Sequence, residues 1–272
     1  MPARYGCLEP WEGDPGAYGA AALRGRFDEC ADEVVRMLED LLEQRLRYEA
    51  QDGERFFDAA RNAALVKGAE HYYRSMYYGS HHSWNLRDRH MFETLQSVMS
   101  HRGGHARAVV WAHNSHLGNA AATSMSARGE TNLGELCRDA YGDDCYAIGF
   151  GTDHGTVAAA DDWGEPMRVM DVNPAHEDSY ERICHDSAVT NFLLPLCAEA
   201  SAEARDALMP ERLERAIGVI YRPRSELASH YFHATLPRQF DEWIWFDETR
   251  AVEPLAVEAD PHKLPETFPF GL

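Results

Sequence analysis

The feature of this 272-residue sequence that most constrains its fold is a change in pattern near residue 105. Before that point, long segments carry apolar residues at helical spacing. After it, short apolar runs bounded by Gly, Asp or Pro have the length and composition of buried strands. These runs are 107–112, 145–151, 156–160, 167–172 and 216–221, with another beginning at Glu242. Helices and strands mixed in this way predict an α/β fold: a layered sheet with flanking helices and an associated helical subdomain.

The helical part is expected to cover residues 1–104. In segment 26–50 the apolar side chains form one stripe of period 3.6, and Asp52 with Gly53 ends that stripe. The second run, 54–79, ends at a glycine, which is a common stop for a helix.

A third helical run is expected to begin at Asn85, because asparagine is a favoured N-cap. Within the α/β part, 105–272, the segment 131–143 predicts one more short helix. We find no internal repeat and no low-complexity linker, so residues 1–272 are expected to form a single domain.

Charge and apolar content restrict the partners. The formal net charge is −19, so nucleic acid and anionic membranes are poor partners, since binding phosphates needs a basic face. No apolar run approaches the roughly 20 residues that span a bilayer, and the N-terminus lacks the pattern of a secretory signal. The six cysteines form no C-x-x-C pair, which favours reduced and mostly buried thiols. We therefore expect a cytoplasmic protein whose partner is a small molecule.

Two histidines, His113 and His116, follow the apolar run VVWA at 109–112. Ligands of open α/β sheets bind outside the carboxyl ends of strands, so both imidazoles are candidate catalytic groups. One could accept a proton from water or stabilise an oxyanion while the other orients it. An equally good interpretation is that one ring bonds a backbone carbonyl and the other lies on the surface. No metal is predicted, because the spacing is not that of a helical zinc pair and the sequence near it offers no third ligand.

Two further residues are candidates for catalysis. Arg87 begins a helical run and could hold a carboxylate or polarise a carbonyl, although an ordinary ion pair would explain it as well. Glu130 lies in a loop before a helix, where it could position a histidine or simply favour the helix N-terminus. The glycine-rich segment 149–155 lacks a phosphate-loop pattern, so no cofactor is predicted. The G-x-S-x-G nucleophile elbow of serine hydrolases is also missing from the sequence.

Six blocks of the sequence, taken in order, closely resemble the erythromycin esterase-like family. They are RYGCLEPWEGDPGAYG (4–19), FFDAARNAALVKGAEHYY (56–73) with its continuation to 95, VVWAHNSHLGNA (109–120), RGETNLGELCRDAYG (128–142), IGFGTDHGTVAAADDW (148–163) and the segment 216–255 that opens with AIGVIY. The resemblance implies an α/β domain with a helical subdomain. It also implies hydrolysis of an ester or a macrolide lactone, as in antibiotic resistance, with histidine activating water.

The resemblance implies which residues belong to the site, and this sequence departs from the family pattern at one point. HNSH matches the family's His-Asn-x-His motif, which places His113 and His116 in the cleft, and Arg87 and Glu130 fall in typical blocks. Family members usually begin with a Gly-Glu-x-x-His-Gly segment that carries the water-activating histidine. This chain resembles the C-terminal two-thirds of the domain and lacks that segment.

Three functional interpretations therefore remain open. The chain hydrolyses an ester or lactone with its own histidines or with a separate N-terminal half. It is instead a catalytically impaired, truncated homologue that associates through exposed strand edges. Or it is a small-molecule binding module without chemistry.

Overall fold

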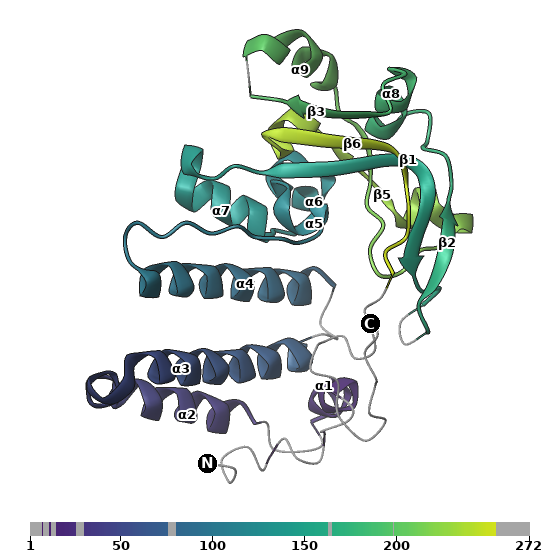
Figure 1. The fold of residues 1–272 in the computed structure, drawn as a ribbon. Helices are drawn as coiled ribbons and strands as arrows, with labels where there is room; N and C mark the ends of the chain where they lie inside the picture. The colour runs from purple at the N-terminus through teal and green to yellow at the C-terminus, as the bar shows by residue number, and fades with distance from the viewer. Residues whose placement is uncertain are drawn as a thin grey trace. The chain divides into compact units, whose positions relative to one another are not determined.

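The computed structural model describes residues 7, 11, 15–25, 30–75, 80–162, 165–197 and 199–253 (Figure 1). The chain divides into two compact units, Met1–Val110 and Trp111–Leu272, and each is described by itself. Among the described residues, no helix is both long and apolar enough to cross a membrane. All six cysteines are free thiols, and Cys30, Cys137 and Cys184 are buried.

The first unit is helical, as its periodicity predicts. Its helices are α1 (Pro15–Leu23), α2 (Ala31–Glu43), α3 (Arg45–Ser75) and α4 (Ser80–Arg102). The predicted break is confirmed, because Asp52 leaves helical geometry inside α3 with φ −163° and ψ 96°. Its Oδ1 accepts a hydrogen bond from the backbone N–H of Arg55 at 3.1 Å, so Asp52 caps the helix that continues after the kink.

The predicted N-cap at Asn85 is wrong, because α4 already begins at Ser80 and Asn85 lies inside it. The residues before Asn85 have ordinary helix propensities, so nothing in them stops the helix from starting earlier. The predicted helix stop at Gly79 lies outside the described residues. A buried hydrogen bond of 2.6 Å from the Tyr18 hydroxyl to Glu70 Oε1 links α1 to α3.

The second unit contains a mixed four-stranded sheet of order β2-β1-β6-β3. Its strands are β1 (Ile148–Ala159), β2 (Arg168–Val172), β3 (Asn191–Pro195) and β6 (Glu242–Thr249). β1 runs parallel to β6, and the other two pairs are antiparallel. A separate antiparallel pair is formed by β4 (Arg212–Arg215) and β5 (Tyr231–Ala234). The strands at 167–172 and from Glu242 are thus confirmed.

The two apolar runs 145–151 and 156–160 form one strand, β1, where the sequence predicts two. The glycines of this strand do not form a turn; they let residues of β6 come close to the β1 backbone. A Cβ on Gly151 would lie 2.4 Å from the Trp243 ring. Gly155 has φ +121°, and its Cβ would lie 1.9 Å from the Thr249 carbonyl oxygen. The neighbouring strand β6 therefore requires glycine at both positions.

Two predicted strands are wrong. Residues 107–112 form no strand, and Val109 and Trp111 are 95% and 84% exposed. In 216–221 the only sheet contact found among the described residues is an isolated bridge from Ile220 to Ala160, and the strand of that region is β4. An apolar run becomes a strand only where a neighbouring backbone segment pairs with it. The spacing of apolar residues in the sequence does not show whether such a segment is present.

Short helices connect and cover the strands of the second unit. They are α5 (Asn114–Leu117), η3 (Ala120–Ala122), α6 (Ser124–Ala127), α7 (Leu133–Tyr141), η4 (Gly142–Asp144), α8 (Tyr180–Asp186), η5 (Glu199–Ser201), α9 (Ala202–Leu208), η6 (Pro223–Ser225), α10 (Glu226–Ser229) and α11 (Leu236–Gln239). The helix predicted within 131–143 is confirmed as α7.

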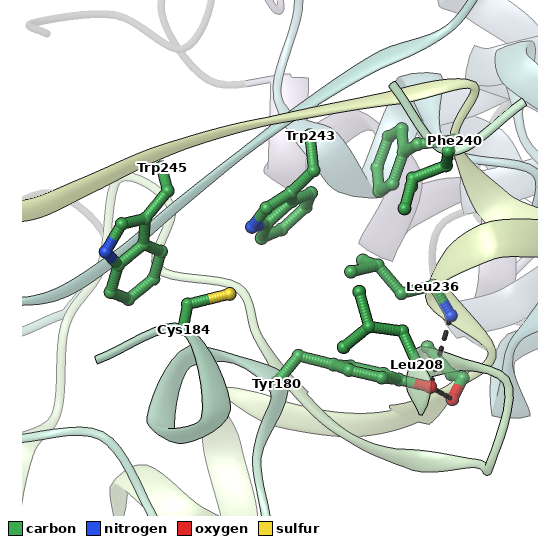
Figure 2. Close-up of a cluster of buried hydrophobic side chains, with 9 residues drawn as sticks. Tyr180, Cys184, Leu208, Leu236, Phe240, Trp243 and Trp245 are labelled. Atoms are coloured by element: carbon green, nitrogen blue, oxygen red, sulfur yellow. Dashed lines mark hydrogen bonds between the residues drawn. The ribbon is translucent and has the colours of Figure 1, made fainter. Parts of the chain in front are cut away.

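One face of the sheet is packed into the main core of this unit. Figure 2 shows Trp243 and Trp245 pointing from β6 toward Cys184 and Tyr180 of α8. The Tyr180 hydroxyl lies 2.9 Å from the carbonyl oxygen of Ala234, so its polar end is satisfied inside the core. Leu208, Leu236 and Phe240 complete this layer.

The opposite face of the sheet exposes apolar side chains. Ile244 pairs with both Phe150 and Leu193, so these residues share the face opposite Trp243. We call the exposed residues Ile148, Phe150, Leu193 and Phe246 the open sheet face; they are 38–57% exposed. A solvated sheet face normally carries polar side chains, so this apolar surface has the character of a face that another layer or a partner covers.

Candidate functional site

The two motif histidines come from a single short turn. His113 caps α5: the backbone N–H of Ser115 donates to its Nδ1 at 3.2 Å, and its Nε2 lies 2.9 Å from the carbonyl oxygen of Ile217. A carbonyl only accepts, so Nε2 carries the proton and Nδ1 is the acceptor. Burial is the largest influence on the pKa of His113 and lowers it. The ring is therefore neutral, with both nitrogens occupied by the fold.

His116 lies half-buried one turn later, and its backbone N–H donates to the carbonyl oxygen of His113 at 2.9 Å. The rings are close enough that charge on His116 contributes, after burial, to the lowered pKa of His113. The two predicted histidines thus lie on the same turn. The His113 ring is bonded to the backbone at both nitrogens, whereas His116 is half-buried one turn later. His113 has the backbone-bonded geometry that was one of the two sequence-based interpretations.

Asn114, between the histidines, attaches the turn to the sheet. Its Nδ2 donates to the carbonyl oxygen of Phe150 at 2.7 Å, and the Phe150 N–H donates to its Oδ1 at 3.2 Å. A neighbouring strand would make the same two hydrogen bonds with the backbone of Phe150. Since β2 pairs only with the later part of β1, the Asn114 side chain takes the place of a strand beside Phe150.

Asn132 and Gly134 hold the turn from the other side. Asn132 caps α7 by accepting from the Glu135 N–H at 2.9 Å. Its Nδ2 donates to the carbonyl oxygens of Ser115 at 2.8 Å and Gly118 at 2.6 Å. A Cβ on Gly134 would lie 2.0 Å from the carbonyl oxygen of Leu117, so only glycine lets α7 come this close. The RGETNLGEL and HNSHLG blocks are thus two halves of one structural unit.

The other two predicted residues belong to other segments of the chain. The Oε2 of Glu130 accepts from Nε and Nη2 of Arg128 at 3.0 and 2.7 Å, which gives this carboxylate a counter-ion in its own loop. Arg87 belongs to α4 of the first unit. Its guanidinium carbon lies 4.9 Å from the centre of the Trp84 ring.

A second group of polar side chains, which the sequence interpretation missed, lies in the same unit. The Oδ2 of Asp153 is 2.9 Å from Nδ1 of His154 and 3.6 Å from Nδ1 of His185. Nδ1 of His185 is also 2.7 Å from Oδ1 of Asp247, and this hydrogen bond is the main reason why the pKa of His185 is raised. The four residues come from β1, α8 and β6, so only the sheet pairing and the packing of α8 bring them together.

This group opens into a cleft of about 560 Å³. Its lining is Asp153, His154, Gly155, Thr156, Asp171, Val172, Pro174, Arg182, His185 and Glu248. The sequence offered one weak signal, the GTDHG segment in which an Asp-His pair stands between glycines. Its partners on α8 and β6 have no motif of their own.

Comparisons with known proteins cover most of the chain. A family model described as erythromycin esterase matches residues 1–249. A crystal structure of a Bacillus cereus protein is 16% identical with a TM-score of 0.67, and the match covers 81% of this chain and 52% of that one.

Two further solved structures match as well. A succinoglycan biosynthesis protein is 17% identical with a TM-score of 0.68, and the match covers 91% of this chain and 56% of that one. A mutant of the erythromycin esterase EreC in its open conformation is 18% identical with a TM-score of 0.55; here the match covers 84% of this chain and 55% of that one. The likeness confirms the mixed α/β fold, and the chain spans about half the length of these solved structures.

Proposed function

The chain belongs to the erythromycin esterase family, and from that premise we propose that it acts in the hydrolysis of a carboxylic ester or lactone by water. The observation that carries the proposal is the unequal pair of imidazoles on one turn. His113 is neutral and bonded to the backbone at both nitrogens. We therefore assign it a positioning role.

His116 is the residue that we assign to the substrate. From a turn held by Asn114 and Asn132, it removes a proton from the attacking water or stabilises the oxyanion that forms at the carbonyl. Preorganisation of this kind matters because a misplaced catalytic group loses most of its effect. Glu130, neutralised by Arg128, remains a proposed supporting residue, and Arg87 of the first unit remains a candidate donor to a carbonyl or carboxylate.

We further propose that another polypeptide packs on this chain and contributes to the site. The open sheet face supports this, because an apolar sheet face in water favours a covering layer. Without that partner, the same surface favours self-association. A non-catalytic small-molecule binding module is the second candidate.

The test is hydrolysis of macrolide lactones and simple aryl esters by the purified full chain. His116→Ala should lower kcat by at least about 100-fold, which is the scale of general acid–base catalysis. His113→Gln should lower kcat less and leave the pH profile of the remaining activity unchanged. His233→Ala is the matched control, since His233 is an exposed histidine beside Glu211.

Equal turnover by wild type and His116→Ala would refute the assignment. Macrolide binding by calorimetry without any turnover would instead support the binding module. Activity that appears only when a separately expressed N-terminal family segment is added would support the partner proposal.

A further inference from the structure

We propose that Asp153, His154 and His185 form a binding site for a divalent transition-metal cation, with zinc as the best fit. The site is separate from the histidine turn of the proposed hydrolysis and does not depend on it. Each residue offers one ligand atom, and these three atoms all lie within 4.8 Å of one another.

The spacing of the ligand atoms suits a tetrahedral ion. Zinc binds imidazole nitrogen and carboxylate oxygen at about 2.0–2.2 Å, which separates the ligand atoms of a tetrahedron by about 3.4 Å. The Oδ2 of Asp153 lies 2.9 Å from Nδ1 of His154 and 3.6 Å from Nδ1 of His185, one distance on each side of that value. The two histidine ligand atoms lie within 4.8 Å of each other, so rotation of these side chains brings all three ligand atoms onto one ion.

The fold holds the central ligand in place. Asp153 is only 3% exposed, and its Oδ1 accepts from the Ala175 N–H at 3.1 Å, which leaves Oδ2 facing the two imidazoles. Nη2 of the buried Arg215 donates to the Asp153 carbonyl at 2.6 Å and restrains the backbone of this residue. Such outer contacts orient metal ligands and are typical of genuine sites.

Asp247 supports one of the ligands without joining them. Its Oδ1 lies 2.7 Å from Nδ1 of His185, so it restrains that imidazole from outside the group. Two imidazole nitrogens and one carboxylate oxygen, with the fourth tetrahedral position left to water, match the ligand preference of zinc. Binding through Nδ1 requires each ring to carry its proton on Nε2 alone, so protons compete with the ion and affinity falls as pH falls.

The surrounding charge also favours a cation. Asp171 and Glu248 line the same cleft as the three ligands. Arg182 is the one Lys or Arg among the described lining residues, and its guanidinium is paired with Asp186 at 2.9 Å. Two imidazoles in an acidic cleft select zinc, copper or nickel over magnesium or calcium, which prefer oxygen ligands alone.

The experiment uses the untagged full chain, stripped with EDTA and titrated with Zn²⁺ in a calorimeter. We expect one tight site in the wild type and an affinity lower by more than about 100-fold in His154→Gln and in His185→Gln, because each removes a direct ligand. The matched control is His233→Gln. The Nδ1 of His233 lies 3.5 Å from an oxygen of Glu211, and both side chains are exposed. Circular dichroism of the metal-free variants separates lost binding from lost folding.

Cobalt substitution identifies the ligands. A site of nitrogen and oxygen donors shows the visible bands of tetrahedral Co²⁺ without the thiolate charge-transfer band that binding at the exposed Cys197 would produce. Thiolate bands, affinities unchanged in both glutamine variants, or no tight binding to the folded wild type would each overturn the proposal. The readout is binding alone, so its failure leaves the proposed hydrolysis untouched.

Discussion

Replacing Asn132 by Asp tests whether this one side chain joins α7 to the histidine turn. The variant keeps the oxygen that caps α7, and Asp caps helices as well as Asn does. It loses the Nδ2 that donates to the carbonyl oxygens of Ser115 and Gly118. In its place, an oxygen faces two carbonyl oxygens at a position that is 1% exposed. Any loss of stability therefore reports the link to the turn and not the helix cap.

The size of the loss follows from the contacts. An ionised carboxylate cannot remain against two carbonyl oxygens in the interior, so the variant is expected to take up a proton. Holding a buried aspartic acid protonated at pH 7.5 costs about 5 kcal/mol relative to the unfolded chain. One of the two donated hydrogen bonds is still lost, at about 1 kcal/mol. The expected loss is about 6 kcal/mol at pH 7.5 and about 2.5 kcal/mol at pH 5, because the cost of protonation falls with pH.

The assay is urea unfolding at both pH values, followed by the fluorescence of the buried Trp243 and Trp245. Asn119→Asp is the control. Asn119 caps η3 by accepting from the Ala121 N–H at 3.0 Å, and we find no hydrogen bond of its Nδ2 among the described residues. Its loss should stay within about 0.5 kcal/mol. Equal losses in the two variants, or a loss at Asn132 that does not shrink at pH 5, would refute the reasoning.

The remaining predictions concern the core, the strands and the surface. Lowering the pH from 7.5 to 5.5 should destabilise the chain in urea less in His113→Asn than in wild type, because burial lowers the pKa of His113 and folding therefore opposes its protonation. Glu214→Gln should flatten the loss of stability in urea as the pH rises above the ordinary carboxyl range, since burial raises the pKa of this carboxyl and its ionisation opposes folding. Gly155→Ala should cost more than about 3 kcal/mol by thermal unfolding, because the added Cβ meets the Thr249 carbonyl oxygen at 1.9 Å. Phe150→Glu should keep the fold and reduce concentration-dependent association in sedimentation velocity, since this side chain belongs to the open sheet face.

Local patterns predicted those parts of the fold that local physics determines. The break at Asp52, the helix after Thr131 and the strand from Glu242 each carry their own signal, and each is confirmed. Where the deciding contact is distant, local patterns failed. Gly151 and Gly155 suggested interruptions, yet both stand inside β1, because the atoms that require glycine belong to β6.

The same distinction applies to the site. The spacing of His113 and His116 in the sequence was sufficient to select them as candidates. Their difference was not predictable, because the partner that holds the His113 ring is the carbonyl oxygen of Ile217, more than a hundred residues away. Asp153 and His185 are brought together only by tertiary packing, and neither lies near the His-Asn-x-His motif in the sequence.

The wrong strand at 107–112 identifies the physical step that a sequence pattern omits. An apolar run predicts burial, and burial needs a covering surface, whereas Val109 is 95% exposed and Trp111 is 84% exposed. The Trp111 ring lies 5.7 Å from the ring of Phe150, so it adjoins the open sheet face. One covering layer would therefore bury Trp111 together with that face. The same layer would supply the pairing strand that the apolar run at 107–112 lacks. Amides 109–111 should then become protected from hydrogen exchange in any associated form, and Phe150→Glu should reduce association and protection together. Protection that persists in the dissociated variant would separate the two surfaces and reject this account.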